Sequence, residues 1–305
     1  MSTVITTAGI GSSRLRTATP SFLGIVRGEL LKVSRQWLTW IMLALLAGGT
    51  IFAHLLTFSI PNAKTNMSQA PLHFLYNEME VSFSILRIFG GIFIIILTAY
   101  LIGMEYQYGT VRILLARGVG RLQLLFAKLL ALVIIALALV IGLLLLNSLM
   151  ICLIIDLIGG NLQALNATSP AFWSNTALYL LTVLISMGVS ILMATAMGAI
   201  GRSLSIGMSA SLAWFPVDNL GMLFLLLAQR LTHNDFWPNI TAYLLGPNLN
   251  VMPEVILPAQ IKANSIGIPP LAQVDGPHTL WVALVYGIVF AAIAIVLTWK
   301  RDVKE

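Results

Sequence analysis

Residues 124–158 read LLFAKLLALVIIALALVIGLLLLNSLMICLIIDLI, an apolar run whose only charged residues are Lys128 and Asp156. An α-helix needs about 20 apolar residues to cross the hydrocarbon core of a bilayer. The run therefore predicts a transmembrane helix, but one that is too long for a single perpendicular span. We expect it either to project into water at one end or to break.

Five further stretches are long and apolar enough to span, which makes six in all. The expected spans are Trp37–Ile60, Val81–Gly103, Leu124–Ile158, Ala171–Ile200, Leu204–Ala228 and Thr279–Trp299. Of the 305 residues, 58% are hydrophobic and 9% charged, whereas a soluble domain is about 25% charged. This composition excludes a cytosolic enzyme, a nucleic-acid-binding domain and a disordered chain. The predicted fold class is an all-α polytopic membrane protein with six transmembrane helices.

The cationic residues predict the orientation of these spans. Of the 17 lysines and arginines, 13 lie on the side of the bundle that holds both termini. Because such residues accumulate on the cytoplasmic side, we expect both termini in the cytoplasm and the chain in the cell (plasma) membrane. Residues 1–19 then form a cytosolic tail, and residues 229–278 form an outer loop. The net charge of +6 marks the cytoplasmic side, so no nucleic-acid partner is expected.

Residues 20–36, PSFLGIVRGELLKVSRQ, predict a helix before the first span. Five apolar side chains fall within one arc of a helical wheel, and the basic residues occupy the rest: Phe22, Val26, Leu30, Val33 and Trp37 against Arg27, Lys32 and Arg35. A basic amphipathic helix of this kind lies flat in the membrane interface. An ordinary juxtamembrane cap is the alternative.

The loop at residues 104–123 predicts a short helix at Thr110–Ala116, which Gly118 and Gly120 end. A new helix is expected from Arg121, with Gly120 as its N-cap. Such a helix is often only a connector. One that is tied rigidly to two spans could instead transmit motion from a cytosolic partner.

Two motifs resemble those of ABC-2 type transporter permeases. The first is Glu105-x-x-x-Gly109-Thr110-x-x-x-Leu114-Leu115-x-x-Gly118-Val119-x-Arg121, followed by Lys128, and the second is the R-x-E-L-x-K-x-x-R pattern of Arg27, Glu29, Leu30, Lys32 and Arg35. The topology fits along nearly the whole chain. Arg117–Gly120 departs from the family's proline- and serine-containing turn, which leaves open how the short helix is capped.

The resemblance implies an interfacial elbow helix at 20–36, a six-span domain at 37–305 and a cytoplasmic coupling helix that docks on a cytosolic ABC ATPase. The implied ATPase-coupling residues are Glu105, Gly109, Thr110, Arg112, Arg117 and Arg121; the arginines could also merely enforce topology. The chain contains no G-x-x-x-x-G-K-[ST] phosphate loop. ATP and Mg²⁺ are therefore expected on the partner ATPase, with no cofactor and no catalytic residue in this chain. A second permease copy or a paralogue completes the expected exporter.

Small residues predict close helix packing, because they let membrane helices approach one another. Ser186, Ser190, Ala194 and Gly198 recur every four residues in the fourth span, and Ser205 and Ser209 do so in the fifth. We expect these stripes to face each other or a neighbouring span. A polar stripe that faces a cavity is the alternative.

Two ionisable residues, Arg87 and Asp218, lie deep in the expected spans. A charge in the hydrocarbon costs at least about 2.5–3.5 kcal/mol and usually has a partner. We hypothesise that the two pair, with Glu78 or Glu80 as a competing partner for Arg87. His54 is interpreted as a packed or hydrogen-bonded histidine rather than a ligand. No metal site is expected, because Cys152 is the only cysteine and His233 and His278 lack ligand spacing.

Two other function classes stay open. An ion-coupled secondary transporter predicts inverted repeats and buried acids near the midplane, of which Asp218 is the one candidate. A non-transporting membrane anchor subunit predicts histidine pairs, whereas His54 stands alone. The sequence does not identify a substrate.

Overall fold

The computed structural model describes residues 20–258, 261 and 267–300, and the expected tail at 1–19 lies outside them. All regular secondary structure in this part of the chain is helical. Six segments are long and apolar enough to cross a membrane: Trp37–Ser59, Pro71–Gln107, Arg121–Gly159, Pro170–Gly201, Leu204–Thr232 and Gly276–Lys300. The predicted six-span, all-α fold class is confirmed.

The first span follows a separate amphipathic helix. Helix α1 (Phe22–Ser34) ends shortly before α2 (Trp37–Leu55), which the 3-10 turn η1 (Leu56–Ser59) extends. The short helix α3 (Ala63–Gln69) then connects to the second span. The helix expected within residues 20–36 is therefore present, while its position in a membrane interface stays a prediction.

The second span begins ten residues earlier than Val81. It consists of α4 (Pro71–Ile85), the π-helical segment η2 (Leu86–Gly90) and α5 (Gly91–Gln107), which run on without a break. Pro71 occupies the first helical position, where its missing N–H costs nothing. A π-helical turn inside a long helix often marks a functional site, and Arg87 lies in this one.

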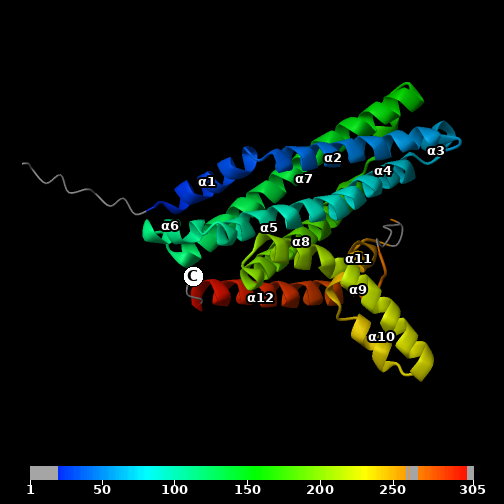
Figure 1. Cartoon of the computed structure of the whole chain (residues 1–305). Coiled ribbons are helices and arrows are strands. Elements are labelled where there is room, and N and C mark those ends of the chain that lie inside the picture. Colours follow the sequence, from blue (N-terminus) through cyan, green and yellow to red (C-terminus); the bar gives the residue numbers. More distant parts are fainter. Residues whose placement is uncertain (1–19, 259–260, 262–266, 301–305) are drawn as a thin grey trace, which may run out of the picture.

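The third span is one unbroken helix, α7 (Arg121–Gly159). Its 39 residues extend for roughly 58 Å at 1.5 Å per residue, against a hydrocarbon thickness of about 30 Å. Of the two expectations, breakage is therefore wrong, and projection into water stays a prediction. The C-terminal end of α7 contacts α3 (Figure 1).

The fourth and fifth spans form an antiparallel pair. The 3-10 turn η3 (Gln163–Ala167) precedes α8 (Pro170–Gly201), and only Arg202 and Ser203 separate α8 from α9 (Leu204–Thr232). The hydroxyl of Ser203 caps α9 by accepting a hydrogen bond from the backbone N–H of Ile206 at 3.1 Å.

The segment before the last span contains α10 (Phe236–Thr241) and α11 (Leu245–Ile256), and α12 (Gly276–Lys300) is the sixth span. The sequence pattern in this segment favours short helices at Ile240–Leu245 and Val251–Leu257, and both observed helices begin earlier. Pro238 and Pro247 account for the difference, because each lies in the first turn of its helix, where proline is tolerated.

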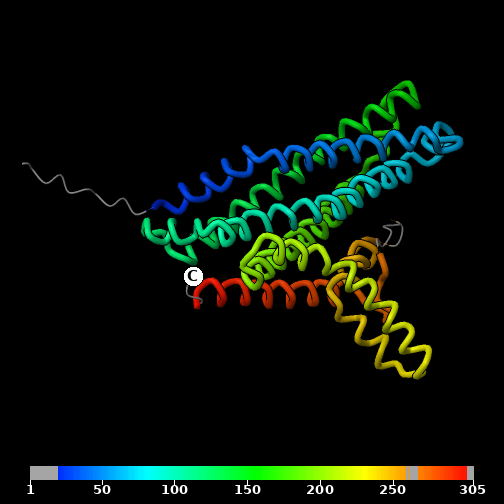
Figure 2. The backbone as a smooth tube through the Cα atoms, viewed as in Figure 1, coloured from blue at the N-terminus to red at the C-terminus, as the bar shows by residue number. Residues whose placement is uncertain are grey.

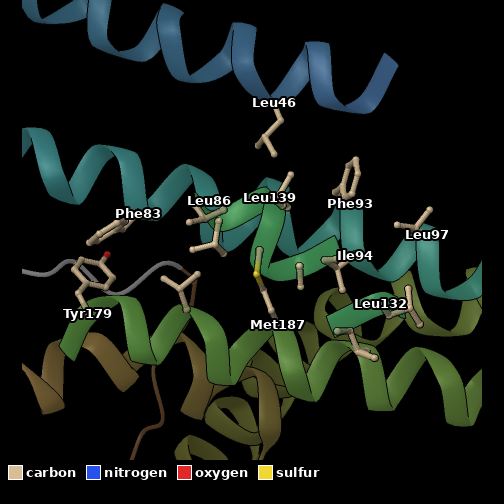
Figure 3. Packing of buried hydrophobic residues seen from close by; sticks show 14 of the residues in the cluster. Leu46, Phe83, Leu86, Phe93, Ile94, Leu97, Leu132, Leu139, Tyr179 and Met187 are labelled. Carbon is tan, nitrogen blue, oxygen red and sulfur yellow. The ribbon is translucent and has the colours of Figure 1, made fainter. Parts of the chain in front are cut away.

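The two largest of the four hydrophobic clusters in the described part of the chain hold most of the spans together. The first lies between α2, the second span, α7 and α8, and its rings include Phe83 and Tyr179, whose centroids are 5.0 Å apart (Figure 3). The second joins α8, α9, α11 and α12, with Trp214 packed edge-on against Phe290. Helix α9 diverges from the other spans toward α10 (Figure 2).

The helices define two ends of the bundle. Helix α1, helix α6 (Thr110–Ala116) and the C-terminal end of α12 lie at one end, which we call the α6 end (Figure 1). Helices α3 and α10 lie away from it, and their side is called the α10 end (Figure 1).

Candidate functional site

Four charged side chains from three helices meet at the α6 end. The Lys32 ammonium lies 3.0 Å from Glu29 Oε1 and 2.9 Å from Glu105 Oε1. The Lys128 ammonium lies 3.0 Å from Glu29 Oε2 and 2.9 Å from Glu105 Oε1. We call Glu29, Lys32, Glu105 and Lys128 the ion network, and it joins α1, α5 and α7.

The ion network is largely shielded from water. Glu29, Glu105 and Lys128 are buried, and only the Lys32 side chain, 44% exposed, reaches the surface. Lys128 also donates a hydrogen bond to the carbonyl of Leu101 at 3.0 Å. Two cations balance two anions, which is the condition under which buried charges are tolerated.

The pKa of Lys32 shows that the ion network favours the charged form of its ammonium. Burial alone would lower the pKa of the ammonium, but the hydrogen bonds and negative charges of Glu105 and Glu29 outweigh it and hold the pKa above its ordinary value. Lys32 therefore stays charged in the network.

Local sequence explains how the three helices present these groups. Glu29 and Lys32 are three residues apart and share one face of α1. Helix α1 is held on α7 by Val26, which packs with Ala127 and Ala131. The sequence motifs contained Glu29, Lys32 and Lys128, but sequence reasoning assigned them no role in the site. The signal that could have found them is the complementary charge of the two motifs.

Helix α6 projects beside this network, bounded by glycines. Gly109, with φ +66°, precedes it and Gly118, with φ +85°, follows it. The N–H of Gly118 donates to the carbonyl of Leu115, and that of Val119 donates to the carbonyl of Leu114. These two bonds form a Schellman motif, which answers how the helix is capped without the family's proline and serine.

The six residues expected to couple to an ATPase fall into two groups. Glu105, Gly109, Arg112 and Arg121 line a cavity of about 310 Å³ between α5, α6, α7, α8 and α12. Thr110 begins α6 and is half-buried, whereas Arg117 follows α6 and is exposed. Arg121 donates to the carbonyl of Trp299 at 3.3 Å, which ties α7 to the end of α12.

The hypothesised pair of Arg87 and Asp218 does not form among the described residues. The Arg87 guanidinium donates to the carbonyl of Asn250 at 3.3 Å, and Asp218 Oδ2 accepts from the N–H of Gly246 at 2.7 Å. Both charges therefore bind α11. The physical reason is that the first turn of α11 offers Asp218 unpaired N–H groups.

The two small-residue stripes have different surroundings. Ala194 and Gly198 are buried in α8, whereas Ser186 and Ser190 line an inner cavity, which is the alternative raised for this stripe. Ser205 and Ser209 of α9 are exposed in this chain.

Gly207 takes the place expected for Ser205 and Ser209 against α8, and Ser211, one turn further along α9, is buried. A Cβ atom added at Gly207 would lie 2.9 Å from Gly198 Cα, so the two backbones touch there. The expectation that Ser205 and Ser209 pack against a neighbouring span is thus corrected. Small residues recur every four positions on two faces of α9, and the face that contains Gly207 is the one that packs on α8.

A buried polar cluster near η1 also escaped the sequence reasoning. His54 Nδ1 lies 2.7 Å from Glu78 Oε2 and His54 Nε2 lies 2.9 Å from Asn147 Oδ1, while Ser82 bonds both His54 and Asn147. Thr57 donates to Glu78 Oε1 at 2.7 Å. The available signal was the four-residue spacing of Glu78 and Ser82. His54 is confirmed as a hydrogen-bonded histidine.

Comparison with known proteins gives one match. A family model described as ABC-2 family transporter protein matches residues 25–216, from α1 into α9. No curated protein and no solved structure matches the chain. Within the described residues, no group of three or more His, Cys, Asp or Glu side chains is arranged to hold a metal ion.

Proposed function

This chain belongs to the ABC-2 family of transporter membrane proteins, and we propose that it is the membrane-spanning permease subunit of an ATP-driven exporter. Members of this family generally work with a cytosolic ATPase and dimerise. Under this proposal the α6 end faces the cytoplasm, ATP and Mg²⁺ bind to the partner ATPase, and a second copy or a paralogue completes the membrane domain.

The observation that carries the proposal is the geometry of the α6 end. Helix α6 presents Arg112 and Ile113 to solvent, with Arg117 following, and the Ile113 side chain is 54% exposed. An exposed apolar residue between two cations is a surface suited to a partner protein. Residues 104–123 would serve as the coupling loop.

The ion network supports a mechanism for transmitting motion. Only Tyr108 and Gly109 separate α6 from α5, and a Schellman turn joins it to α7. Because the ion network fastens α1 to both α5 and α7, displacement of α6 moves three helices together. Closure of two ATPase subunits would rock these helices and open a path outward between the two permease copies.

A reconstitution experiment tests the proposal. An ATPase subunit encoded next to this chain is purified with it, and ATP hydrolysis and co-elution are measured for the wild type and for Arg112→Glu. We expect the charge reversal to weaken association at least tenfold. The control is Arg230→Glu, which reverses an exposed arginine at the C-terminal end of α9. Failure of the wild type to bind any ATPase overturns the proposal.

One observation favours a second candidate, an ion-coupled transporter. The His54–Glu78 pair is fully buried and joins α2 to α4, and histidine–carboxylate chains serve as proton relays in membrane carriers. Uptake into proteoliposomes separates the two candidates. Transport that needs ATP supports the exporter, and transport driven by a proton gradient without ATP supports the second candidate.

A further inference from the structure

An inner cavity of about 330 Å³ lies where η2, α5, α8, α9 and α11 meet. Its polar side chains come from all of these elements except α5, and its other walls are apolar or glycine. The polar residues are Arg87, Ser186, Ser190, Asn219 and Asn250. Cavities that bind small molecules have this composition, and they begin at about 300 Å³.

The cavity lies at membrane depth. Ser190 is 11 residues from the end of α8 at Gly201, which is roughly 17 Å at 1.5 Å per residue. If α8 enters the hydrocarbon near Gly201, this distance places Ser190 about halfway across a core that is about 30 Å thick. A charged or polar group here is expensive to maintain and usually has a partner or a function.

Arg87 is the cation of this cavity, and its guanidinium is incompletely satisfied. The residue is 8% exposed, and Nη2 donates to the carbonyl of Asn250 at 3.3 Å. Nη1 is buried, with no hydrogen-bond partner in the described part of the chain. None of the described residues that line the cavity is acidic. Glu80, the competing partner considered for Arg87, acts on the guanidinium through its charge but does not line the cavity. Among the described residues, Arg87 therefore keeps donor capacity at Nη1.

A guanidinium of this kind matches an oxygen anion. Arginine carries five donors in a planar fork, which binds carboxylate or phosphate oxygens with two parallel bonds. The hydroxyls of Ser186 and Ser190 lie in the same lining and are the available neutral donors. The side-chain amide of Asn219 already donates to the carbonyl of Phe215, and that of Asn250 donates to Asn219 Oδ1 and to the carbonyl of Ile268. These two amides therefore shape the polar wall of the cavity. Asp218 does not compete, because its Oδ2 already accepts from Gly246.

We propose that the inner cavity binds the anionic headgroup of an amphiphile, and that Arg87 pairs with its oxygen anion. A single cation favours a monoanionic headgroup. The apolar walls, which include Ile92, Leu212 and Phe215, suit the acyl-bearing part of the same molecule. This assignment names the substrate class and rests on the proposed transport function.

Binding of a defined probe to the purified full chain tests the assignment. In neutral detergent micelles, short-chain dihexanoylphosphatidylglycerol is expected to bind at least tenfold more tightly than dihexanoylphosphatidylcholine. Arg87→Gln should remove this preference, and Arg87→Lys should keep part of it. Arg230→Gln removes an exposed arginine outside the cavity and should change nothing. Equal affinity for the two lipids, or an unchanged preference in Arg87→Gln, overturns the proposal.

Gly91 offers a second variant that leaves Arg87 in place. This glycine lines the cavity, and a Cβ atom added there meets no other atom within 4 Å. Gly91→Leu should therefore fill the cavity and reduce binding of the anionic lipid at least tenfold, whereas Gly91→Ala should keep it. Retained affinity in Gly91→Leu, at an unchanged melting temperature, contradicts a site in this cavity.

Two further arms complete the test. Inorganic phosphate should fail to displace the lipid at equal concentration, and displacement would mean a soluble anion and overturn the amphiphile assignment. All binding is measured without ATP or ATPase. A negative result here therefore leaves the ATPase association of the proposed function standing, and failure of that association leaves the binding result interpretable.

Discussion

The buried ammonium of Lys128 gives the most informative perturbation of the ion network. Its side chain is 4% exposed and contacts both Glu29 and Glu105. Lys128→Met keeps a long unbranched side chain and removes the charge, so two buried carboxylates are left with Lys32 alone. Removing one partner of a buried ion pair costs about 3–5 kcal/mol, and we expect a loss of this size in the free energy of unfolding.

Lys32 provides the matched control, because its ammonium contacts the same two carboxylates. Its side chain is 44% exposed, so water can replace part of the interaction in Lys32→Met. An exposed ion pair contributes up to about 1 kcal/mol, and we expect a loss near this limit. Burial alone thus predicts a difference of at least about 2 kcal/mol between the two lysines.

The assay is equilibrium unfolding in mixed micelles, followed by tryptophan fluorescence as SDS is titrated. A double variant, Glu105→Gln with Lys128→Met, restores equal numbers of positive and negative charges. Its loss should be smaller than the sum of the two single losses, by about 0.5–3 kcal/mol for side chains in contact. Equal losses for the two lysine variants would show that burial does not strengthen the contacts of Lys128, and strict additivity in the double variant would show that Glu105 and Lys128 do not interact.

Three further substitutions have defined outcomes. Gly103→Ala should lower stability by about 1–3 kcal/mol, since its Cβ would lie 2.6 Å from the backbone of α9; unfolding in SDS measures this. His54→Leu should cost about 1–3 kcal/mol in the same assay, because Glu78 would lose a buried partner. Gly118→Ala should strain the turn after α6, where φ is +85°, by about 1–2 kcal/mol, and lower the ATPase stimulation measured with the partner subunit.

Each of these substitutions has a control in the same chain. Gly142→Ala adds a methyl group that meets no atom within 4 Å and should be neutral or stabilising. His73→Leu changes an exposed histidine of α4, and Gly120→Ala changes a glycine with negative φ. If any control matches its partner variant, the structural reason given for that partner is wrong.

The number of spans could be predicted from sequence because each depends on one local property, a long apolar run. The start of the second span could not. Glu78 and Glu80 made residues 71–80 resemble a water-exposed loop, yet the Glu78 carboxylate is buried against His54 and Thr57 of the first span. The partners that make this helix possible are more than 20 residues away, so no local pattern reveals them.

The rotation of α9 about its own axis was the second feature that the sequence could not predict. A four-residue repeat of small residues occurs on two faces of α9, one with Ser205 and Ser209 and the other with Gly207 and Ser211. The face that packs on α8 follows from the backbone contact at Gly198, which depends on both helices together. The pairing of Arg87 with Asp218 failed for a similar reason, since α11 supplies a backbone hydrogen-bond partner to each of them.

The candidate site was predicted best where motifs supplied it. Glu105, Gly109, Arg112 and Arg121 were named from a family resemblance, and they line one cavity beside α6. The docking of α6 on an ATPase stays a prediction.

Photo-crosslinking from α6 tests that docking most directly. A crosslinking residue placed at Ile113, and for comparison at the exposed Tyr243 after α10, is activated in native membranes, and the products are identified by mass spectrometry. Docking of α6 predicts a crosslink from Ile113, and none from Tyr243, to a protein that carries a phosphate-binding loop of the ABC ATPase type. Absence of such a protein among the Ile113 products, or equal yields from both positions, would contradict it.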